Sequence, residues 1–371
     1  MLYHLFSWLH ETQGFPRLGL YVSFRIAAAF LSAFLLCLLL GPRFIAWQRR
    51  RRLGENLDKM GQERRALVPE GKAGTPTMGG LLIGCGLCAA ALAWCRLDEP
   101  LVWLGLLVYC GMGAVGAWDD QVKLFHPTRH GLTFRTKLAW TAGLCLVVGL
   151  VLAHVVWTGP QAPLQALVLP FLKDADLSLA GLGALPFVAL VCVTICGSAN
   201  AVNLADGMDG LATGCLLVAG ITLAAMCYVI GRVDYAGYLY VPHVAGAAEV
   251  AVLLAAMVGA CFGFLWYNAA PAQLFMGDVG SLSLGALLGF AAVACRMELA
   301  LVVVGGVFVV EALSVVLQVG SWKLRRKRVF LCAPIHHHFQ KQGVPETKIV
   351  VRFWIAAVLL SCLSLTLFKL R

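Results

Sequence analysis

Ten runs of apolar residues, separated by polar or turn-rich breaks, constrain the fold of this chain more than any other feature. Most of them approach the roughly 20 residues that a helix needs to cross a lipid bilayer. Only 13% of the 371 residues are charged, whereas soluble domains carry about 25%. We therefore predict an all-α polytopic membrane protein with about ten transmembrane helices. The approximate cores of the predicted spans are 21–46, 77–95, 101–118, 138–157, 184–200, 211–230, 249–266, 281–295, 299–320 and 349–368.

The basic residues are distributed unevenly between the two sides of the predicted bundle. The loops on one side together carry 19 Lys and Arg, and those on the other side carry 7. Because cytoplasmic loops are enriched in Lys and Arg, we expect the first side to be cytoplasmic and, with an even number of spans, both termini to be extracytoplasmic. The net charge of +10 then indicates a membrane surface rather than a nucleic acid. The predicted cytoplasmic loops of this single domain, 1–371, are 47–76, 119–137, 201–210, 267–280 and 321–348.

Two adjacent carboxylates, Asp119 and Asp120, end the third apolar run. Two neighbouring negative charges repel each other unless a cation or strong donors compensate them. A solvated helix end explains one such pair as well as a functional site does. The bases that follow, Lys123, Arg135 and Lys137, suit a phosphate ligand, although the positive-inside bias accounts for each of them too.

A second polar cluster lies in the segment 200–210, which contains two Asn, two Asp and two Gly. Asp206 and Asp209 are three residues apart and would share a face if the segment were helical. The glycines would let the backbone approach a ligand closely. The spacing resembles a calcium loop, but the downstream Glu of that motif is missing. A merely structural turn does not need two acids and two Asn, so a functional role is favoured.

The first cytoplasmic loop ends in Lys72-Ala73-Gly74-Thr75-Pro76-Thr77-Met78-Gly79-Gly80. An ammonium group followed by hydroxyls and by free backbone N–H groups at a helix start can hold an anion. A capped helix start with Pro near its first turn is the simpler explanation of this segment taken alone.

Two further clusters belong to the last two cytoplasmic loops. In 268–281, Asp278 lies between glycines at a predicted helix start, with an aromatic residue three positions before it. In Pro334-Ile335-His336-His337-His338-Phe339, three consecutive His cannot form a tetrahedral zinc site by themselves, because adjacent side chains point apart. They could bind phosphate or carboxylate, or orient other groups.

The predicted cytoplasmic face therefore collects five acids close to several cations. Carboxylates with few His or Cys partners suit a hard, oxygen-seeking ion, of which Mg²⁺ bridging phosphates is the usual case. Phosphoryl transfer needs this combination of positioning and charge neutralisation. Since the chain has no P-loop and no kinase motifs, a nucleotide would be a donor or leaving group rather than an energy source. The five acids are Asp119, Asp120, Asp206, Asp209 and Asp278.

In this order and spacing, the clusters resemble those of the polyprenyl-phosphate N-acetylhexosamine-1-phosphate transferase superfamily. The match extends from about residue 40 to 360. Two blocks, 75–80 and 334–339, and the tail 343–354 are similar to the phospho-N-acetylmuramoyl-pentapeptide transferase branch. Where that family usually has Thr and Leu in its Asn-Leu-Thr-Asp-Gly-Leu-Asp-Gly block, this chain has Ala205 and Met208, which puts a role of the missing hydroxyl in doubt.

The resemblance implies a ten-helix enzyme of the bacterial cytoplasmic membrane with a cytoplasmic active site. It would transfer phospho-MurNAc-pentapeptide from UDP-MurNAc-pentapeptide to undecaprenyl phosphate, giving lipid I and UMP in peptidoglycan synthesis, with Mg²⁺. The implied partners are these two substrates and the lipid bilayer, without nucleic acid, and a homodimer is one expectation for the assembly.

The resemblance also implies roles for individual residues. The expected catalytic residues are Asp119, Asp120, Asp278, His337 and His338, and the three Asp are also the expected metal ligands. The expected substrate-binding residues are Lys72, Thr77, Lys123, Arg135, Lys137, Asn203, Asp206, Gly207, Asp209, Asn268 and Phe275, with Phe275 stacking on uracil. Glu311 and Gln318 lie within the ninth span, where an acid is costly, so we expect them to have polar partners or to line a groove.

Two other functions are compatible with parts of the pattern. A GlcNAc-1-phosphate transferase of another envelope glycan would share the acidic blocks but should lack the triple His and the 75–80 block. A solute transporter would place ionisable residues near the bilayer midplane, whereas the acids of this chain gather at one face and Arg25 and Glu311 are the main deep exceptions. Direct attack by the lipid phosphate and a double displacement through an Asp–phosphate intermediate both remain open.

Overall fold

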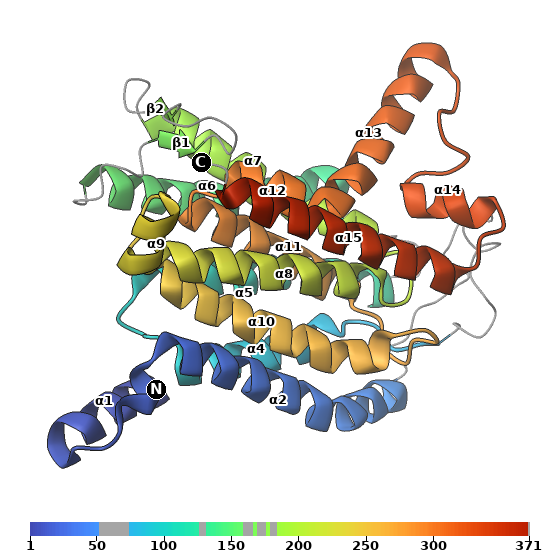
Figure 1. Cartoon of the computed structure of the whole chain (residues 1–371). Helices are drawn as coiled ribbons and strands as arrows, with labels where there is room; N and C mark the ends of the chain where they lie inside the picture. Colours follow the sequence, from blue (N-terminus) through green and yellow to red (C-terminus); the bar gives the residue numbers. More distant parts are fainter. Residues whose placement is uncertain (52–73, 126–130, 159–165, 169–175, 179–183, 370–371) are drawn as a thin grey trace.

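The computed structural model describes residues 1–51, 74–125, 131–158, 166–168, 176–178 and 184–369, with the backbone alone at 155–158, 166–168, 176–178 and 369. In this part of the chain, α-helices run side by side in a bundle, and both termini lie at the same end of it (Figure 1). The helices of the first half are α1 (Leu2–Gln13), the 3-10 helix η1 (Arg17–Leu20), α2 (Val22–Arg50), α4 (Gly80–Trp94), α5 (Pro100–Phe125), α6 (Phe134–Thr158) and α7 (Ala184–Ala205). Those of the second half are α8 (Leu211–Ile230), α9 (Val233–Leu239), α10 (Ala247–Asn268), α11 (Gly277–Ala294), α12 (Glu298–Val304), α13 (Gly306–Arg325), α14 (Ile335–Lys341) and α15 (Glu346–Lys369).

The helices confirm the prediction of a polytopic membrane protein. Nine helices in the described residues are long and apolar enough to cross a bilayer, and α4, the tenth apolar helix, has 15 residues. The ninth predicted span, 299–320, is divided between α12 and α13 at Gly305 and Gly306. Adjacent glycines favour such a break, because each costs a helix interior about 1 kcal/mol relative to Ala. The nine long helices are α2, α5, α6, α7, α8, α10, α11, α13 and α15.

Helices α10 and α11 form the centre of the bundle. Most of their residues are buried, 83% and 89% of the apolar windows respectively, because α2, α4 and α8 pack around α10 while α5 and α7 pack around α11. Arg25 of α2 is buried in this core and forms a bidentate ion pair with Glu249 of α10, with both N–O distances 2.6 Å. This pair compensates the deep charge that the sequence places in the first span.

Two short strands, β1 (Ala166–Val168) and β2 (Asp176–Ser178), pair in antiparallel fashion, with Leu167 opposite Leu177. The sequence predicts a short hairpin in 158–183 at the membrane interface. The strand pair confirms the hairpin, and its place at the interface stays a prediction.

Several helices extend beyond the predicted spans, and this changes where the polar clusters lie. Helix α5 continues to Phe125, so the acidic pair at its end is helical, and α11 begins at Gly277, so Asp278 lies in its first turn. Helix α7 ends at Ala205 and the chain turns through 206–210. Because residues 206–210 are not helical, the condition under which Asp206 and Asp209 would share a helical face is not met.

Candidate active site

Three carboxylates from two helices meet at one end of the bundle. Asp119 and Asp120 come from the last turns of α5, and Asp278 comes from the first turn of α11. One oxygen from each lies within 4.8 Å of the other two. Asp119 and Asp120 are 3% and 4% exposed, and the Asp278 side chain is 14% exposed. This group, called the carboxylate cluster below, offers the oxygen ligands that can hold a divalent cation.

Close contact between α5 and α11 makes the cluster possible. A Cβ atom at Gly116 of α5 would lie 2.3 Å from the Asp278 carbonyl oxygen, so only glycine lets the two backbones approach this closely. Gly277 has φ +72°, and a Cβ atom there would lie 2.6 Å from Asp120 Oδ2. These two glycines are therefore needed by the geometry of the site rather than by a ligand.

Two lysines neutralise most of the negative charge. Lys123 Nζ lies 2.6 Å from Asp119 Oδ2, 3.1 Å from Asp278 Oδ2 and 3.6 Å from Asp120 Oδ1. Lys137, in the first turn of α6, approaches Asp278 Oδ2 to 2.5 Å and Asp119 Oδ2 to 3.9 Å. Three carboxylates and two ammonium groups have a formal net charge of minus one, in a largely buried place where charge interactions are strong.

Each carboxylate has one oxygen held by a neutral donor and one that faces the lysines. Oδ1 of Asp119 accepts a hydrogen bond of 2.7 Å, Oδ1 of Asp278 one of 2.9 Å, and Oδ2 of Asp120 one of 3.2 Å. This fixes the side chains while their second oxygens remain directed at cations. The donors are, in the same order, the Leu132 backbone N–H, the Asn203 side-chain amide and the Val279 backbone N–H.

Asn203 is an expected substrate contact that the structure brings directly to the cluster. Its amide donates to Asp278 Oδ1 and, at 2.8 Å, to Ser281 Oγ. Ser281 in turn donates to the Gly277 carbonyl oxygen, which holds the first turn of α11. Ser281 is not among the predicted site residues; its position three residues after Asp278 at a helix start is the signal that could have identified it.

The segment 75–80 borders the cluster because it pairs with the start of α11. The Phe275 N–H donates to the Pro76 carbonyl oxygen at 2.9 Å, and the Gly79 N–H donates to the Phe275 carbonyl oxygen at 2.8 Å. Thr77 is thereby placed next to Gly277, with Oγ1 3.2 Å from the position of an added Cβ. Phe275 is half-buried, and Lys72 lies outside the described residues.

Asp209 and Asn268, both expected at the substrate, bind neighbouring parts of the protein. Asp209 Oδ2 accepts the Ala272 N–H at 3.0 Å. The Asn268 side chain is 3% exposed; its Oδ1 accepts the Thr213 hydroxyl at 2.8 Å and its Nδ2 donates to the Leu274 carbonyl oxygen at 3.0 Å. The two side chains therefore brace the 206–210 turn against the 269–276 loop, and their contact with substrate stays a prediction.

The remaining predicted residues lie in different environments. Asp206 is half-buried and Gly207 is exposed on the turn after α7. Arg135 is exposed in the first turn of α6. The structure leaves the predicted contacts of these three residues with substrate untested.

The triple His divides into one buried and two half-buried side chains. His336 is 1% exposed, and its Nδ1 lies 3.1 Å from Oε1 of the equally buried Glu311, which confirms the polar partner expected for that acid. A Cβ atom at Gly207 would lie 2.3 Å from His336 Nε2, so the ring packs on the turn after α7. The sequence placed His336 in the triple His and predicted a polar partner for Glu311, but it did not show that the two residues pair.

The other two His hold α14 locally. His337 Nδ1 lies 3.0 Å from Gln340 Oε1, and His338 Nδ1 accepts the Leu331 N–H at 3.1 Å. Their expected positions near the phosphates stay predictions.

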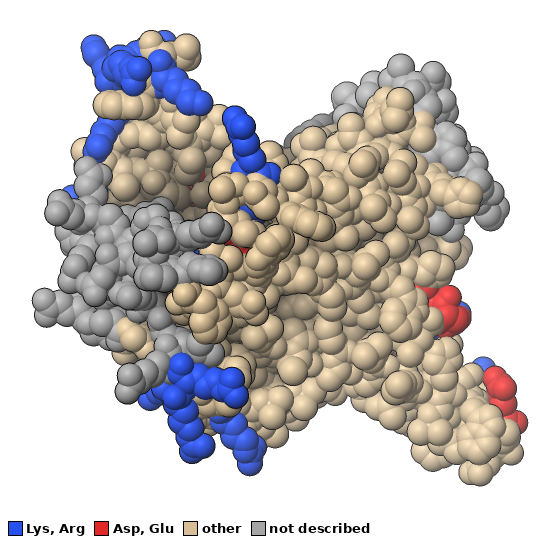
Figure 2. Space-filling model, turned by 180° about the vertical axis from the view of Figure 1, so that it is seen from behind, with Lys and Arg blue, Asp and Glu red and all other residues tan. Residues whose placement is uncertain are grey.

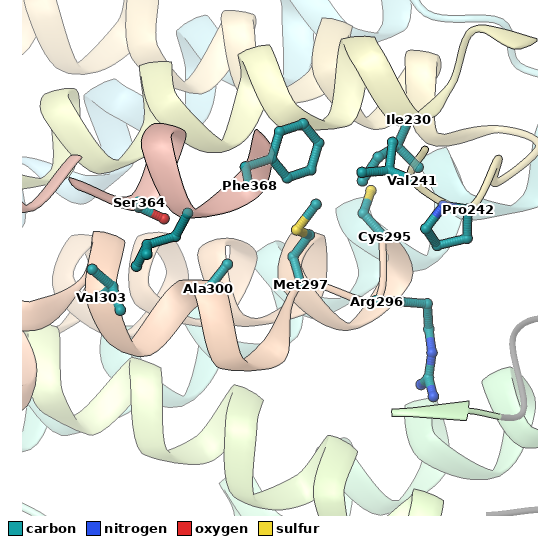
Figure 3. A pocket seen from close by; sticks show the side chains of 11 residues that line it. Ile230, Val241, Pro242, Cys295, Arg296, Met297, Ala300, Val303, Ser364 and Phe368 are labelled. Atoms are coloured by element: carbon teal, nitrogen blue, oxygen red, sulfur yellow. The ribbon is translucent and has the colours of Figure 1, made fainter. Parts of the chain in front are cut away.

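A separate cavity involves none of these residues (Figure 3). It lies where α12 and α15 pack together, and apart from Ser364 and Arg296 the side chains around it are apolar. The guanidinium group of Arg296 points away from the cavity (Figure 3) and lies over the Phe187 ring. The cavity therefore offers space for an apolar group and no chemistry of its own.

Comparisons with known proteins match the parts of the chain that form this site. Residues 102–296, which include the carboxylate cluster, match the model of glycosyl transferase family 4, and residues 72–83 match signature 1 of phospho-N-acetylmuramoyl-pentapeptide-transferase. The chain is 46% identical over 372 residues to the phospho-N-acetylmuramoyl-pentapeptide-transferase of Nitratidesulfovibrio vulgaris (strain DP4), covering 100% of both chains. It is 44% identical over 354 residues to the protein of the same name from Bartonella quintana (strain Toulouse), covering 95% of each.

Proposed function

Because the chain belongs to the phospho-N-acetylmuramoyl-pentapeptide-transferase family, we propose that it transfers phospho-MurNAc-pentapeptide from UDP-MurNAc-pentapeptide to undecaprenyl phosphate. The products are lipid I and UMP, in a membrane step of peptidoglycan synthesis. The observation that carries this proposal is the carboxylate cluster, with three carboxylate oxygens within 4.8 Å of one another and two lysines beside them. The match of residues 72–83 to the muramoyl signature supports this branch over a GlcNAc-1-phosphate transferase.

The residues of the cluster fit Mg²⁺. Mg²⁺ prefers oxygen ligands, and one carboxylate oxygen of each of the three Asp lies within 4.8 Å of the other two. Asp119, Asp120 and Asp278 would hold the ion. When bound, it would neutralise charge that develops on the diphosphate.

The lysines have the position and charge to bind the donor's phosphates. Lys123 and Lys137 approach the same oxygen, Asp278 Oδ2. They would exchange part of these contacts for phosphate oxygens when the donor binds, which stabilises charge on the leaving UMP.

Proton transfer in the proposed reaction falls to the acidic pair at the end of α5. A phosphate monoester keeps a proton with a second pKa of about 6, so the base has only to remove the last proton of undecaprenyl phosphate. Asp119 Oδ2 and Asp120 Oδ1 are directed at a lysine rather than at a neutral donor, and either oxygen can accept that proton.

We further propose that the cluster faces the cytoplasm. Lys and Arg gather on the side of the molecule where α2 ends and where the tip of α13 lies, whereas the two largest groups of acids in this view lie on the opposite side (Figure 2). The positive-inside rule supports a cytoplasmic position for the basic end, and both termini lie at the other end (Figure 1).

The test of the proposed function is UMP release by purified protein with UDP-MurNAc-pentapeptide, undecaprenyl phosphate and Mg²⁺. We expect UMP together with a lipid-extractable muropeptide. Product from UDP-GlcNAc instead would assign the chain to the rival branch. Failure to release a nucleotide from any UDP-sugar, in a folded sample supplied with lipid, would refute a transferase.

The same preparation distinguishes the two chemical routes. Without undecaprenyl phosphate, a double displacement through an Asp–phosphate releases one equivalent of UMP per enzyme, whereas direct attack releases none.

A further inference from the structure

The outer half of α13 leaves the bundle and projects away from the other helices (Figure 1). From Val316 onward its apolar side chains lack partners within the described residues: Val316 is 64% exposed, Leu317 is 56% exposed and Leu324 is 85% exposed. Exposure of so many neighbouring apolar side chains to water would be unfavourable. In a membrane protein, this stem belongs in the hydrocarbon of the bilayer.

The tip of α13 carries the densest cationic segment among the described residues. Five of the six residues in 323–328 are Lys or Arg, all of them exposed, and the chain contains no Asp or Glu between Glu311 and Glu346. Figure 2 shows Lys and Arg gathered on this protruding end. Among the described residues, four of these cations have no carboxylate within ion-pair distance. They are Lys323, Arg325, Arg326 and Lys327.

Hydrogen bonds hold the tip in one shape. Oε1 of Gln318 accepts the N–H groups of Val329 at 3.0 Å and Phe330 at 2.9 Å, and its Nε2 donates to the Phe330 carbonyl oxygen at 3.2 Å. The Ser321 hydroxyl donates to the Lys327 carbonyl oxygen at 2.8 Å. These hydrogen bonds hold residues 327–330, which fold back along α13, so the cations lie on an ordered turn. These bonds also confirm the polar partners expected for Gln318.

The outer half of α13 projects sideways from the bundle, and its tip lies at the end of the bundle where α2 also ends (Figure 1). The cations at the tip are therefore at one end of the membrane-spanning helices rather than near their middle. With the stem in the hydrocarbon, the cations reach the headgroup layer, and Trp322, 48% exposed, lies where aromatic side chains favour the interface.

We propose that residues 323–328 form a binding site for the anionic headgroups of bilayer phospholipids. Charge complementarity identifies the ligand, because adjacent cations at the end of a membrane helix attract phosphodiester headgroups of the same leaflet. The apolar stem indicates that the bound phosphate belongs to a lipid, because the acyl chains of a lipid can contact the stem and a free phosphate cannot. The Leu331 N–H on the returning chain donates to His338, so lipid bound at the tip would also restrain α14; this consequence rests on the proposed function.

The test measures lipid binding and does not depend on catalysis. Phosphatidylglycerol and phosphatidylcholine with the same acyl chains are titrated into the full-length protein in a neutral detergent, and the bound lipid is counted by native mass spectrometry. We expect a phosphatidylglycerol preference that falls about fivefold in Arg326→Gln and is lost when all five cations are replaced by Gln. Glycerol phosphate, which lacks acyl chains, should not compete at equal concentration.

Two further variants make the test specific. Gln318→Ala removes the fastening of the tip without changing charge, and it should weaken phosphatidylglycerol binding about threefold to tenfold. Gln replacement of Arg43, Arg49, Arg50 and Arg51, an exposed basic group at the end of α2, should lower phosphatidylglycerol binding less than the five-residue replacement does, because it leaves the cations of 323–328 in place. Wild-type phosphatidylglycerol binding by the folded five-residue variant, an equal loss in the α2 variant, or full competition by glycerol phosphate would each overturn the proposal. If the wild-type protein released no UMP but bound phosphatidylglycerol as expected, the proposed transferase function would be refuted and the proposed lipid site would still be supported.

Discussion

Replacing Asn203 by Ala removes the amide that orients the Asp278 carboxylate, at 2.9 Å from its Oδ1. A hydrogen bond to a charged acceptor contributes about 1.5–3 kcal/mol. If the whole of it serves to hold the productive orientation, kcat falls about 10- to 150-fold. Because Asp278 is a proposed Mg²⁺ ligand, the Mg²⁺ concentration for half-maximal activity should also rise, by about 10- to 100-fold.

The assay is UMP release at saturating substrates over a Mg²⁺ titration. Asn200→Ala is a matched control, because Asn200 lies one turn earlier on α7 and its amide donates to the Cys196 carbonyl oxygen of the same helix at 2.8 Å. We expect this control to stay within about twofold of wild type.

The pattern of kinetic changes decides whether the reasoning holds. A raised KM for UDP-MurNAc-pentapeptide, with kcat and Mg²⁺ dependence unchanged, would show that Asn203 binds substrate and does not position Asp278. An equal loss in Asn200→Ala would attribute the effect to α7 as a whole.

Three further predictions follow from buried contacts. Arg25→Met should lower the free energy of unfolding by about 3–5 kcal/mol, measured by thermal unfolding in detergent, and Arg25→Met with Glu249→Leu should recover most of it; equal stability of the single variant and wild type would contradict this. Gly277→Ala should reduce activity at least about tenfold, since φ is +72° and the added Cβ would lie 2.6 Å from a carboxylate oxygen of the cluster, whereas Gly143→Ala, with nothing within 4 Å, should be unaffected. Glu311→Ala should destabilise the protein by about 1–3 kcal/mol because a buried imidazole N–H loses its acceptor, and Glu311→Gln should be milder.

Sequence patterns predict most of this fold because the bilayer leaves a chain few alternatives. Helices must satisfy their own backbone groups in hydrocarbon, so apolar runs and their breaks locate the spans to within a few residues. The predicted ends of the spans were wrong where polar residues continue a helix. Asp119 and Asp120, for example, lie on α5 rather than in a loop. The break between α12 and α13 was missed, because an apolar run by itself does not show that a Gly-Gly pair will divide it.

The sequence predicted which acids form the candidate site, but it did not predict the hydrogen bonds that hold them. Asp119, Asp120 and Asp278 were recognised by residue type and spacing, and the structure brings them together. The donors that fix them could not be derived, because the Leu132 N–H and the Asn203 amide reach the acids only through the packing of α5, α6, α7 and α11.

The most direct test of the account is the transfer of labelled phospho-MurNAc-pentapeptide into the lipid phase by wild type, Asp278→Asn and Asp98→Asn. Asp278 lies in the carboxylate cluster, whereas Asp98 is about half-exposed in a surface ion pair with Arg96. The account predicts a loss of at least about a hundredfold in Asp278→Asn and wild-type transfer in Asp98→Asn, with both variants folded. Wild-type transfer by Asp278→Asn would contradict the assignment of the carboxylate cluster as the catalytic centre.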